Sequence, residues 1–243
     1  MANTRGVFNL RKLTEEKIPL NEWVDLDNVW HSPSPAATSD TGYFGGGMTP
    51  SPVATMDKVT FSTDTTAAAP GANFSVNRNG VAGASSPVAG YFGGGNGSSG
   101  TPIATMDKTT FASDTTAALP GADLSLARVR LAATGNSTHG YFGGGNYPGT
   151  STMDKTTYST DTTAYTPGAN LSQARHFLAG ASGREGGMGA DPPTATPTPA
   201  TTIGPPPPVP TPNTGYYVAG NDPHVSIVDK TTFSNDTTAR VPG

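Results

Sequence analysis

A block that recurs about every fifty residues constrains the fold of this chain more than any other feature. The string Gly-Tyr-Phe-Gly-Gly-Gly begins at Gly42, Gly90 and Gly140, and a degraded copy begins at Gly215. A second block containing Asp-Lys follows each copy, with its aspartate at Asp57, Asp107, Asp154 and Asp229. These aspartates lie 50, 47 and 75 residues apart. A fixed period of this size predicts a repeat architecture in which each repeat is one supersecondary unit.

Each repeat is predicted to supply four short strands. In the first repeat the Tyr-Phe pair and its glycines form one strand, and residues 55–63 form a second with alternating faces. A turn containing Asp precedes a third strand over 65–69, which Pro70-Gly71 ends. The fourth strand is small and apolar, and it starts after an arginine: Arg78, Arg128 or Arg175.

The spacing from the second-block aspartate to this arginine is 21 residues in all three complete repeats. Loop lengths vary easily, whereas the positions of paired strands do not. The constant spacing predicts a structural ion pair, across strands or between repeats, rather than a catalytic pair. The residues concerned are Asp57 and Arg78, Asp107 and Arg128, Asp154 and Arg175, with Asp229 in the fourth repeat.

Composition supports an all-β chain rich in turns. Only 34% of the 243 residues are hydrophobic, there are 31 Gly and 23 Pro, and the net charge is only −4. Disordered chains combine low hydrophobicity with high net charge, so composition does not favour disorder here. The weak negative charge argues against nucleic-acid partners, and no apolar run is long enough to insert into a membrane. Because the chain has no cysteine, disulfides and thiolate chemistry are excluded.

The chain divides into a leader and a repeat region. Residues 1–41 carry no repeat and hold both tryptophans, Trp23 and Trp30, which either form a satellite cluster or anchor a partner. No signal peptide is recognisable there. A Pro- and Thr-rich insertion, 184–213, is expected to be an exposed loop or spacer. The repeats are assigned to residues 42–89, 90–139, 140–183 and 214–243.

The last repeat stops before its arginine strand, so it is predicted to lack one strand. The segment from Asn3 to Phe8 resembles Asn170 to Phe177 and could complete it. Closure by the N-terminus is one hypothesis. An open array of four units and closure by another copy of the chain are the alternatives.

The order Tyr-Phe-Gly-Gly, an aromatic strand with Asp, a turn, Pro and Arg resembles kelch repeats. This resemblance implies an all-β, kelch-like β-propeller of about four repeats, either incomplete or closed by the N-terminus or by oligomerisation. The chain departs from the kelch pattern because it lacks that family's tryptophan and has fewer repeats than its usual six or seven.

A closer resemblance is to repeat proteins of tailed marine cyanophages. The strings that carry it are Tyr-Phe-Gly-Gly-Gly, Thr-Met-Asp-Lys, Ser-Thr-Asp-Thr-Thr-Ala, Ala-Ala-Thr-Gly-Asn-Ser and the opening Met1 to Leu10. It implies a structural or tail-associated virion component that is made in the host cytoplasm. Other virion proteins would then be its partners, and the leader would dock through Arg5, Phe8, Trp23 and Trp30.

The sequence contains no constellation typical of an enzyme. His31, His139, His176 and His224 lack metal-ligand spacing, and no Lys-Ser/Thr follows the glycine runs as in a phosphate loop. We therefore expect a non-enzymatic protein without a metal or cofactor. The alternative to a purely structural virion component is a carbohydrate-binding adhesin that holds host surface glycans through loop aromatics such as Tyr147.

Overall fold

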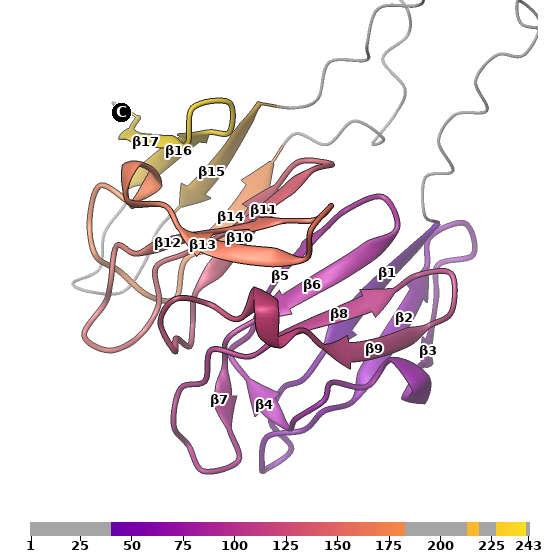
Figure 1. Cartoon of the computed structure of the whole chain (residues 1–243). Helices are drawn as coiled ribbons and strands as arrows, with labels where there is room; N and C mark the ends of the chain where they lie inside the picture. Colours follow the sequence, from indigo (N-terminus) through magenta and orange to yellow (C-terminus); the bar gives the residue numbers. More distant parts are fainter. Residues whose placement is uncertain (1–39, 183–212, 219–226, 242–243) are drawn as a thin grey trace, which may run out of the picture. The chain divides into compact units, whose positions relative to one another are not determined.

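The computed structural model describes residues 40–182, 213–218 and 227–241, and within these ranges the chain consists of short antiparallel strands (Figure 1). The strands form four consecutive sheets in which hydrogen-bonded neighbours follow the order of the chain. The first sheet contains β1 (Thr41–Gly45), β2 (Met56–Thr60) and β3 (Thr65–Ala68). The second contains β5 (Ala82–Ser85), β6 (Ala89–Gly93), β8 (Met106–Thr110) and β9 (Thr115–Ala118). The third contains β10 (Ala132–Gly135), β11 (His139–Gly143), β12 (Met153–Thr157) and β13 (Thr162–Tyr165). The fourth contains β14 (Ala179–Ser182), β15 (Thr214–Val218), β16 (Val228–Thr232) and β17 (Thr237–Arg240).

The repeated motifs set the same register in every sheet. In the second sheet Tyr91 lies opposite Lys108, and Phe92 lies opposite Asp107. Directly opposed residues project on the same face, and successive residues project on opposite faces. Each sheet therefore has one face with Tyr and Lys and another with the second aromatic residue and Asp.

The strand that follows each arginine belongs to a different sheet from the one predicted. After Arg128, β10 pairs with β11 of the next repeat and not with the strands of its own repeat. The alternation of residues along a strand determines which side chains share a face. It does not determine whether the strand pairs with the strands before it or with those after it in the sequence. The fourth repeat supplies only β15, β16 and β17, as predicted, but β14 completes its sheet, so within the described ranges the first sheet and not the fourth has three strands. The segment from Asn3 to Phe8 lies outside the described residues.

Short connecting elements repeat as well. Pro-Gly-Ala forms a 3₁₀ turn after the last strand of each of the first three sheets: η1 (Pro70–Ala72), η2 (Pro120–Ala122) and η3 (Pro167–Ala169). Proline suits the first turn of a helix because its fixed φ is helical and its missing N–H is not needed there. A small ladder joins β4 (Arg78–Asn79) to β7 (Asn96–Gly97).

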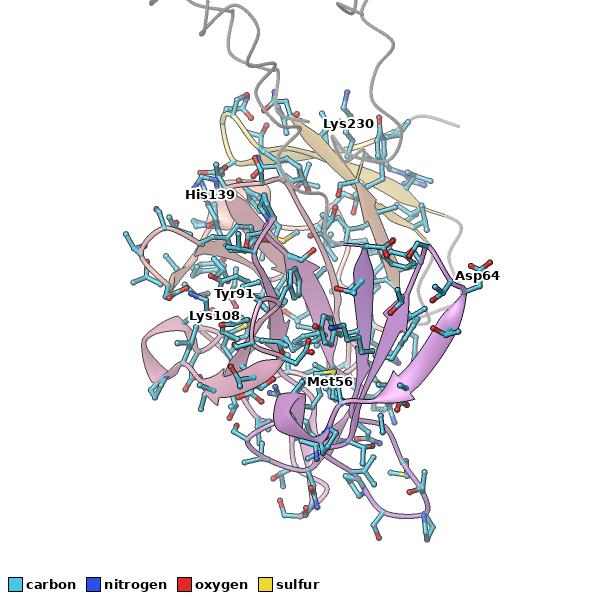
Figure 2. The ribbon with its side chains drawn as sticks, turned by 90° about the vertical axis from the view of Figure 1, so that its right-hand side faces the viewer. Met56, Asp64, Tyr91, Lys108, His139 and Lys230 are labelled. Atoms are coloured by element: carbon cyan, nitrogen blue, oxygen red, sulfur yellow. The ribbon has the colours of Figure 1, made fainter. Side chains whose placement is uncertain are left out.

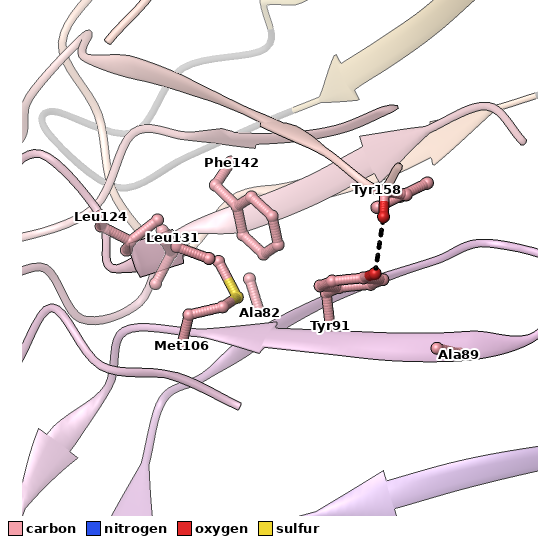
Figure 3. Close-up of a cluster of buried hydrophobic side chains, with 9 residues drawn as sticks. Ala82, Ala89, Tyr91, Met106, Leu124, Leu131, Phe142 and Tyr158 are labelled. Carbon is pink, nitrogen blue, oxygen red and sulfur yellow. Dashed lines mark hydrogen bonds between the residues drawn. The ribbon is translucent and has the colours of Figure 1, made fainter. Parts of the chain in front are cut away.

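The core lies between consecutive sheets. In the best-filled cluster Met106 and Leu131 pack with Phe142, which comes from the third sheet (Figure 3). The first strands of the second, third and fourth sheets, β5, β10 and β14, are built from small residues because β10 packs against both β5 and β14. A Cβ on Gly180 of β14 would lie only 2.4 Å from the carbonyl oxygen of Ala133 in β10.

The all-β prediction is confirmed, and the propeller prediction is confirmed only in part. The described ranges show repeated antiparallel sheets but not a closed ring. The Pro- and Thr-rich insertion separates two strands that are direct neighbours, since Ser182 of β14 pairs with Gly215 of β15. The insertion itself lies outside the described residues, as do Arg5, Phe8, Trp23 and Trp30 of the leader.

Replacing Gly94 by Ala should destabilise the fold strongly. Gly94 has φ +72°, and an added Cβ would lie 2.5 Å from the carbonyl oxygen of Arg128. Gly100 is the matched control, because it has a similar φ of +76° but open space around it. Both variants carry the left-handed backbone cost, and the clash should add about 2 kcal/mol to Gly94→Ala alone. Urea unfolding measures the difference, and equal losses in the two variants would contradict this account.

Candidate functional site

The junctions between consecutive sheets carry most of the buried charge in the described part of the chain. Arg78, Arg128 and Arg175 are fully buried, and so are Asp107, Asp154 and Asp229. The three arginines pair with these aspartates at 2.8, 2.6 and 2.8 Å. Each pair joins an arginine to the aspartate of the following repeat.

Arg128 shows how the guanidinium is held. Its Nη1 donates to the carbonyl oxygens of Gly144 and Thr152 at 2.9 and 2.7 Å. Its Nη2 donates to the carbonyl oxygen of Phe142 at 3.2 Å and to Oδ2 of Asp154 at 2.6 Å. All four acceptors belong to the third sheet or to the loop between β11 and β12. Burial lowers the pKa of Arg128, and the charge of Asp154 opposes that shift.

The backbone of the same arginine belongs to the preceding sheet. The carbonyl oxygen of Arg128 accepts a hydrogen bond from the N–H of Gly95 at 2.7 Å. The backbone N–H of Arg128 donates to the carbonyl oxygen of Ile103 at 3.2 Å. Gly95 and Ile103 lie in the loop between β6 and β8 of the second sheet. Corresponding backbone bonds hold Arg78 and Arg175. Each arginine therefore fastens two sheets, one through its backbone and the other through its side chain.

The serine three residues before the arginine completes the junction. Ser75 donates its N–H to Oδ2 of Asp107 at 3.0 Å and its hydroxyl to Oδ1 at 2.7 Å. Ser172 makes the same two contacts with Asp229 at 3.1 and 2.6 Å. One Ser-x-x-Arg segment thus supplies both the cation and the extra donors that a buried carboxylate requires.

The ion pairs run between repeats, which is one of the two predicted arrangements, but they do not join the residues that lie 21 positions apart. The constant spacing of 21 residues suggested Asp57 with Arg78, but Arg78 reaches Asp107 in the next sheet. Asp57 is exposed in the first sheet, unlike its three counterparts. The spacing is constant because both residues are fixed within one repeat, although the contact itself runs between repeats.

A second polar cluster lies at each junction. The ring of Tyr141 stacks on Phe233 with centroids 4.7 Å apart, and its hydroxyl donates to Oδ1 of Asp236 at 2.5 Å. Lys155 donates to both carboxylate oxygens of Asp236 at 2.8 Å and lies over the Tyr141 ring. The aspartate occupies a turn with φ +52°, a conformation that Asp tolerates better than most residues.

The same cluster recurs at the other two junctions. Tyr91 stacks on Tyr158, as Figure 3 shows, and Asp161 accepts from both Tyr91 and Lys108. Tyr43 stacks on Phe111, and Asp114 accepts from both Tyr43 and Lys58. Sequence reasoning missed these clusters, although the invariant Lys after the second-block Asp and the invariant turn Asp were the available signals.

These contacts shift the ionisation of the residues that make them. Burial and the hydrogen bond to Asp236 raise the pKa of Tyr141. Burial also raises the pKa of Asp236, but the hydrogen bonds from Lys155 and Tyr141 outweigh it. The pKa of Asp236 therefore lies below its ordinary value of 3.8. Asp161 behaves in the same way at the preceding junction.

The buried arginines and aspartates bind each other across consecutive sheets. Each buried guanidinium at the described junctions forms an ion pair with a buried carboxylate, although the arginine Nε atoms and Oδ1 of Asp154 have no hydrogen-bond partner. In the described ranges no three His, Asp or Glu side chains gather as metal ligands would. His139 lies in β11 and His176 is buried, while His31 and His224 lie outside the described residues. Over the same ranges no helix is long and apolar enough to cross a membrane.

Arg128→Ala should cost about 3 to 5 kcal/mol of unfolding free energy, because it leaves Asp154 buried without its cation. Arg240→Ala is the control, since Arg240 is exposed on β17 and its loss should change stability by no more than about 0.5 kcal/mol. Chemical denaturation of both variants tests this. Similar stabilities would show that the buried pair contributes little to the junction.

The Tyr–Lys–Asp clusters should make stability fall in acid. Because the pKa of Asp236 is depressed in the folded state, its contribution is present above pH 3.8 and is lost as the pH falls through the folded-state value. Asp236→Asn should flatten the dependence of the urea midpoint on pH between 6 and about 2.5. Asp57→Asn, at an exposed aspartate, should keep the wild-type slope. An unchanged slope in Asp236→Asn would refute the assignment.

A scan of the sequence against models of known protein families found no match, and neither did a search of curated proteins. The fold does have counterparts among solved structures. One of them, described as "Structure of YjhT", superimposes with a TM-score of 0.58 at 12% sequence identity. The match covers 84% of this chain and 62% of that chain, so this chain corresponds to less than two thirds of the other. At this identity the likeness shows a shared fold alone.

Proposed function

We propose that this chain is a non-enzymatic structural component of a tailed-phage virion, associated with its tail, baseplate or fibres. Its leader docks onto the particle through Arg5, Phe8, Trp23 and Trp30, and its repeat region, a kelch-like propeller arc, is displayed outward. The sequence strings shared with cyanophage repeat proteins support the virion assignment. Other virion proteins are its partners, and it requires no cofactor.

The observation that carries the non-enzymatic part is the repetition of the junctions. The same Arg–Asp pair and Tyr–Lys–Asp cluster occur at successive junctions, and a residue needed at every junction serves the scaffold. A catalytic group would instead be expected at one place, in a cleft with an unusual environment. Rigid joints of this kind suit a protein that projects from a particle under mechanical load.

An exposed aromatic patch favours a second candidate function, the carbohydrate-binding adhesin. The side chain of Tyr147 is 80% exposed and meets His176 edge-on, with ring centroids 5.5 Å apart. Phe177 is exposed too and lies against the same His176, with ring centroids 5.2 Å apart, and Arg130 lies over the Phe177 ring at 4.5 Å. Flat exposed rings with a neighbouring cation can stack on the apolar face of a sugar.

The backbone of this patch is strained in a way that fits a binding role. Arg130 and Phe177 have φ of +61° and +53°, at the position where the first repeat has Gly80. Bulky residues in the left-handed region cost free energy, and such strain concentrates at functional sites. The left-handed turn recurs in the first repeat at Gly80, so what distinguishes the patch is the bulky residue at that position, and the exposed ring and cation favour a surface ligand such as a host glycan.

The double variant Trp23→Ala/Trp30→Ala should abolish incorporation into particles without unfolding the chain. Tryptophans commonly dominate an interface, so at least about tenfold fewer copies per particle are expected. Quantitative mass spectrometry of purified particles counts the copies, and circular dichroism checks the fold of the variant.

Tyr147→Ala is the matched control, because it removes an exposed aromatic residue outside the leader. It should be incorporated at the wild-type level, and reduced adsorption of those particles to host cells would support the adhesin. The structural proposal is wrong if purified wild-type particles lack the chain. It is also wrong if the double tryptophan variant is incorporated at full copy number.

A further inference from the structure

In each Tyr–Lys–Asp cluster the two sheets contribute different residues. The first and the fourth sheet of the described structure therefore each carry one half of such a cluster without the other half. At an internal junction the earlier sheet supplies Tyr and Lys, and the later sheet supplies an aromatic residue and the turn Asp. The fourth sheet carries the first half, Tyr216 and Lys230, which lie opposite each other in the ladder. The first sheet carries the second half, Phe61 and Asp64, with φ +52° at the aspartate.

Both halves are exposed in the described structure. The side chain of Tyr216 is 38% exposed, compared with 1% for Tyr91 and 0% for Tyr141. Phe61 is 56% exposed, and Asp64 and Lys230 are exposed as well. Figure 2 labels Asp64 and Lys230, together with the internal counterparts Tyr91 and Lys108.

The face of the first sheet around Phe61 also exposes apolar side chains, together with Asp57, which lies opposite Phe44 in the ladder. Phe44 is 69% exposed, whereas its counterparts Phe142 and Tyr217 are buried against the preceding sheet. Val59 stands where the later sheets have a buried threonine that bonds to a threonine on the next strand. An exposed face that combines aromatic and aliphatic side chains with carboxylates is typical of a protein interface.

We propose that these two faces bind each other between copies of the chain. Tyr216 and Lys230 of one copy contact Phe61 and Asp64 of another, reproducing the stacked ring and charged hydrogen bonds of the internal junctions. Lys230 and Asp64 carry opposite charges, and Tyr216 and Phe61 are aromatic rings that can stack. The same Lys–Asp pairing occurs at three junctions within the chain. This association is heterologous, so it generates a ring or an open filament rather than a two-fold dimer with one shared patch.

A second copy is the occupant favoured by the described structure. Both halves are exposed at the same time, so neither half covers the other in the arrangement described. The inference concerns the isolated chain and does not depend on where in a particle, or whether in a particle, the chain works.

Charge reversal on the full-length chain tests the proposal. Wild-type protein should associate, so its mass in sedimentation equilibrium should exceed that of one chain. Asp64→Lys and Lys230→Asp should each weaken association by at least about tenfold, because each brings two like charges together. Circular dichroism establishes that each variant is folded.

Mixing the two variants separates contacts between copies from contacts within one chain. In an equimolar mixture Lys230 of the first variant meets Asp64 of the second, and the reversed residues also meet, so association should return. Arg240→Asp is the control. Arg240 lies opposite Asp229 in the ladder, and therefore on the face of the fourth sheet away from Lys230. This variant should associate like the wild type.

Three outcomes would overturn the proposal. The first is a wild-type chain that stays monomeric up to roughly 100 μM, about the weakest association such an interface should show. The second is a mixture in which association does not return. The third is a monomer that each single reversal destabilises and only the double variant Asp64→Lys/Lys230→Asp restores, which would mean that the two faces close within one chain.

Discussion

The arginine that spans two sheets is the interaction on which the rest of this fold depends. Its carbonyl oxygen and N–H are bonded to one sheet, and its guanidinium reaches three carbonyl oxygens and a carboxylate of the next. A buried charge is tolerated only when its donors are satisfied in good geometry. Arginine meets much of this demand because its planar fork offers several fixed donors, which the single ammonium of lysine could not replace. The Nε atoms of Arg78, Arg128 and Arg175 are nevertheless buried without a hydrogen-bond partner in the described structure. The arginine side chain ties each sheet directly to its neighbour, alongside the Tyr–Lys–Asp cluster of the same junction.

This dependence explains how a chain with only 34% hydrophobic residues can hold its sheets together. The apolar clusters are small, and between them lie fully buried threonines and the arginine–aspartate pairs. Thr109 bonds to Thr116, whose hydroxyl in turn donates to the carbonyl oxygen of Ala72 in the preceding repeat. Polar contacts therefore specify which surfaces meet, and the buried aromatic residues supply large apolar surfaces beside them.

The sequence predicted the strands and the importance of the Asp and Arg positions, but not the partners. Period and alternation are local properties, so β1, β2 and β3 could be placed from residues 42–69 alone. Whether Arg128 bonds to Asp107 or Asp154 depends on whether the next strand stays with its own repeat or joins the following one. Both arrangements give the same spacing of 21 residues, so no count along the chain can distinguish them. The Tyr–Lys–Asp clusters were missed for the same reason, since Tyr141 and Asp236 are far apart in sequence and only sheet-to-sheet packing brings them together.

The placement of the Pro- and Thr-rich insertion has a consequence for how such a protein can acquire new sequence. In the second and third sheets the first two strands are joined by three residues, 86–88 and 136–138, whereas residues 183–213 join β14 to β15. The β14–β15 ladder nevertheless keeps the register of the others. Lengthening a hairpin loop tenfold adds only about 2 kcal/mol of closure entropy, because that cost grows with the logarithm of length. This hairpin is therefore a natural graft point, where a peptide or a small folded module could be carried without disturbing the joints between sheets.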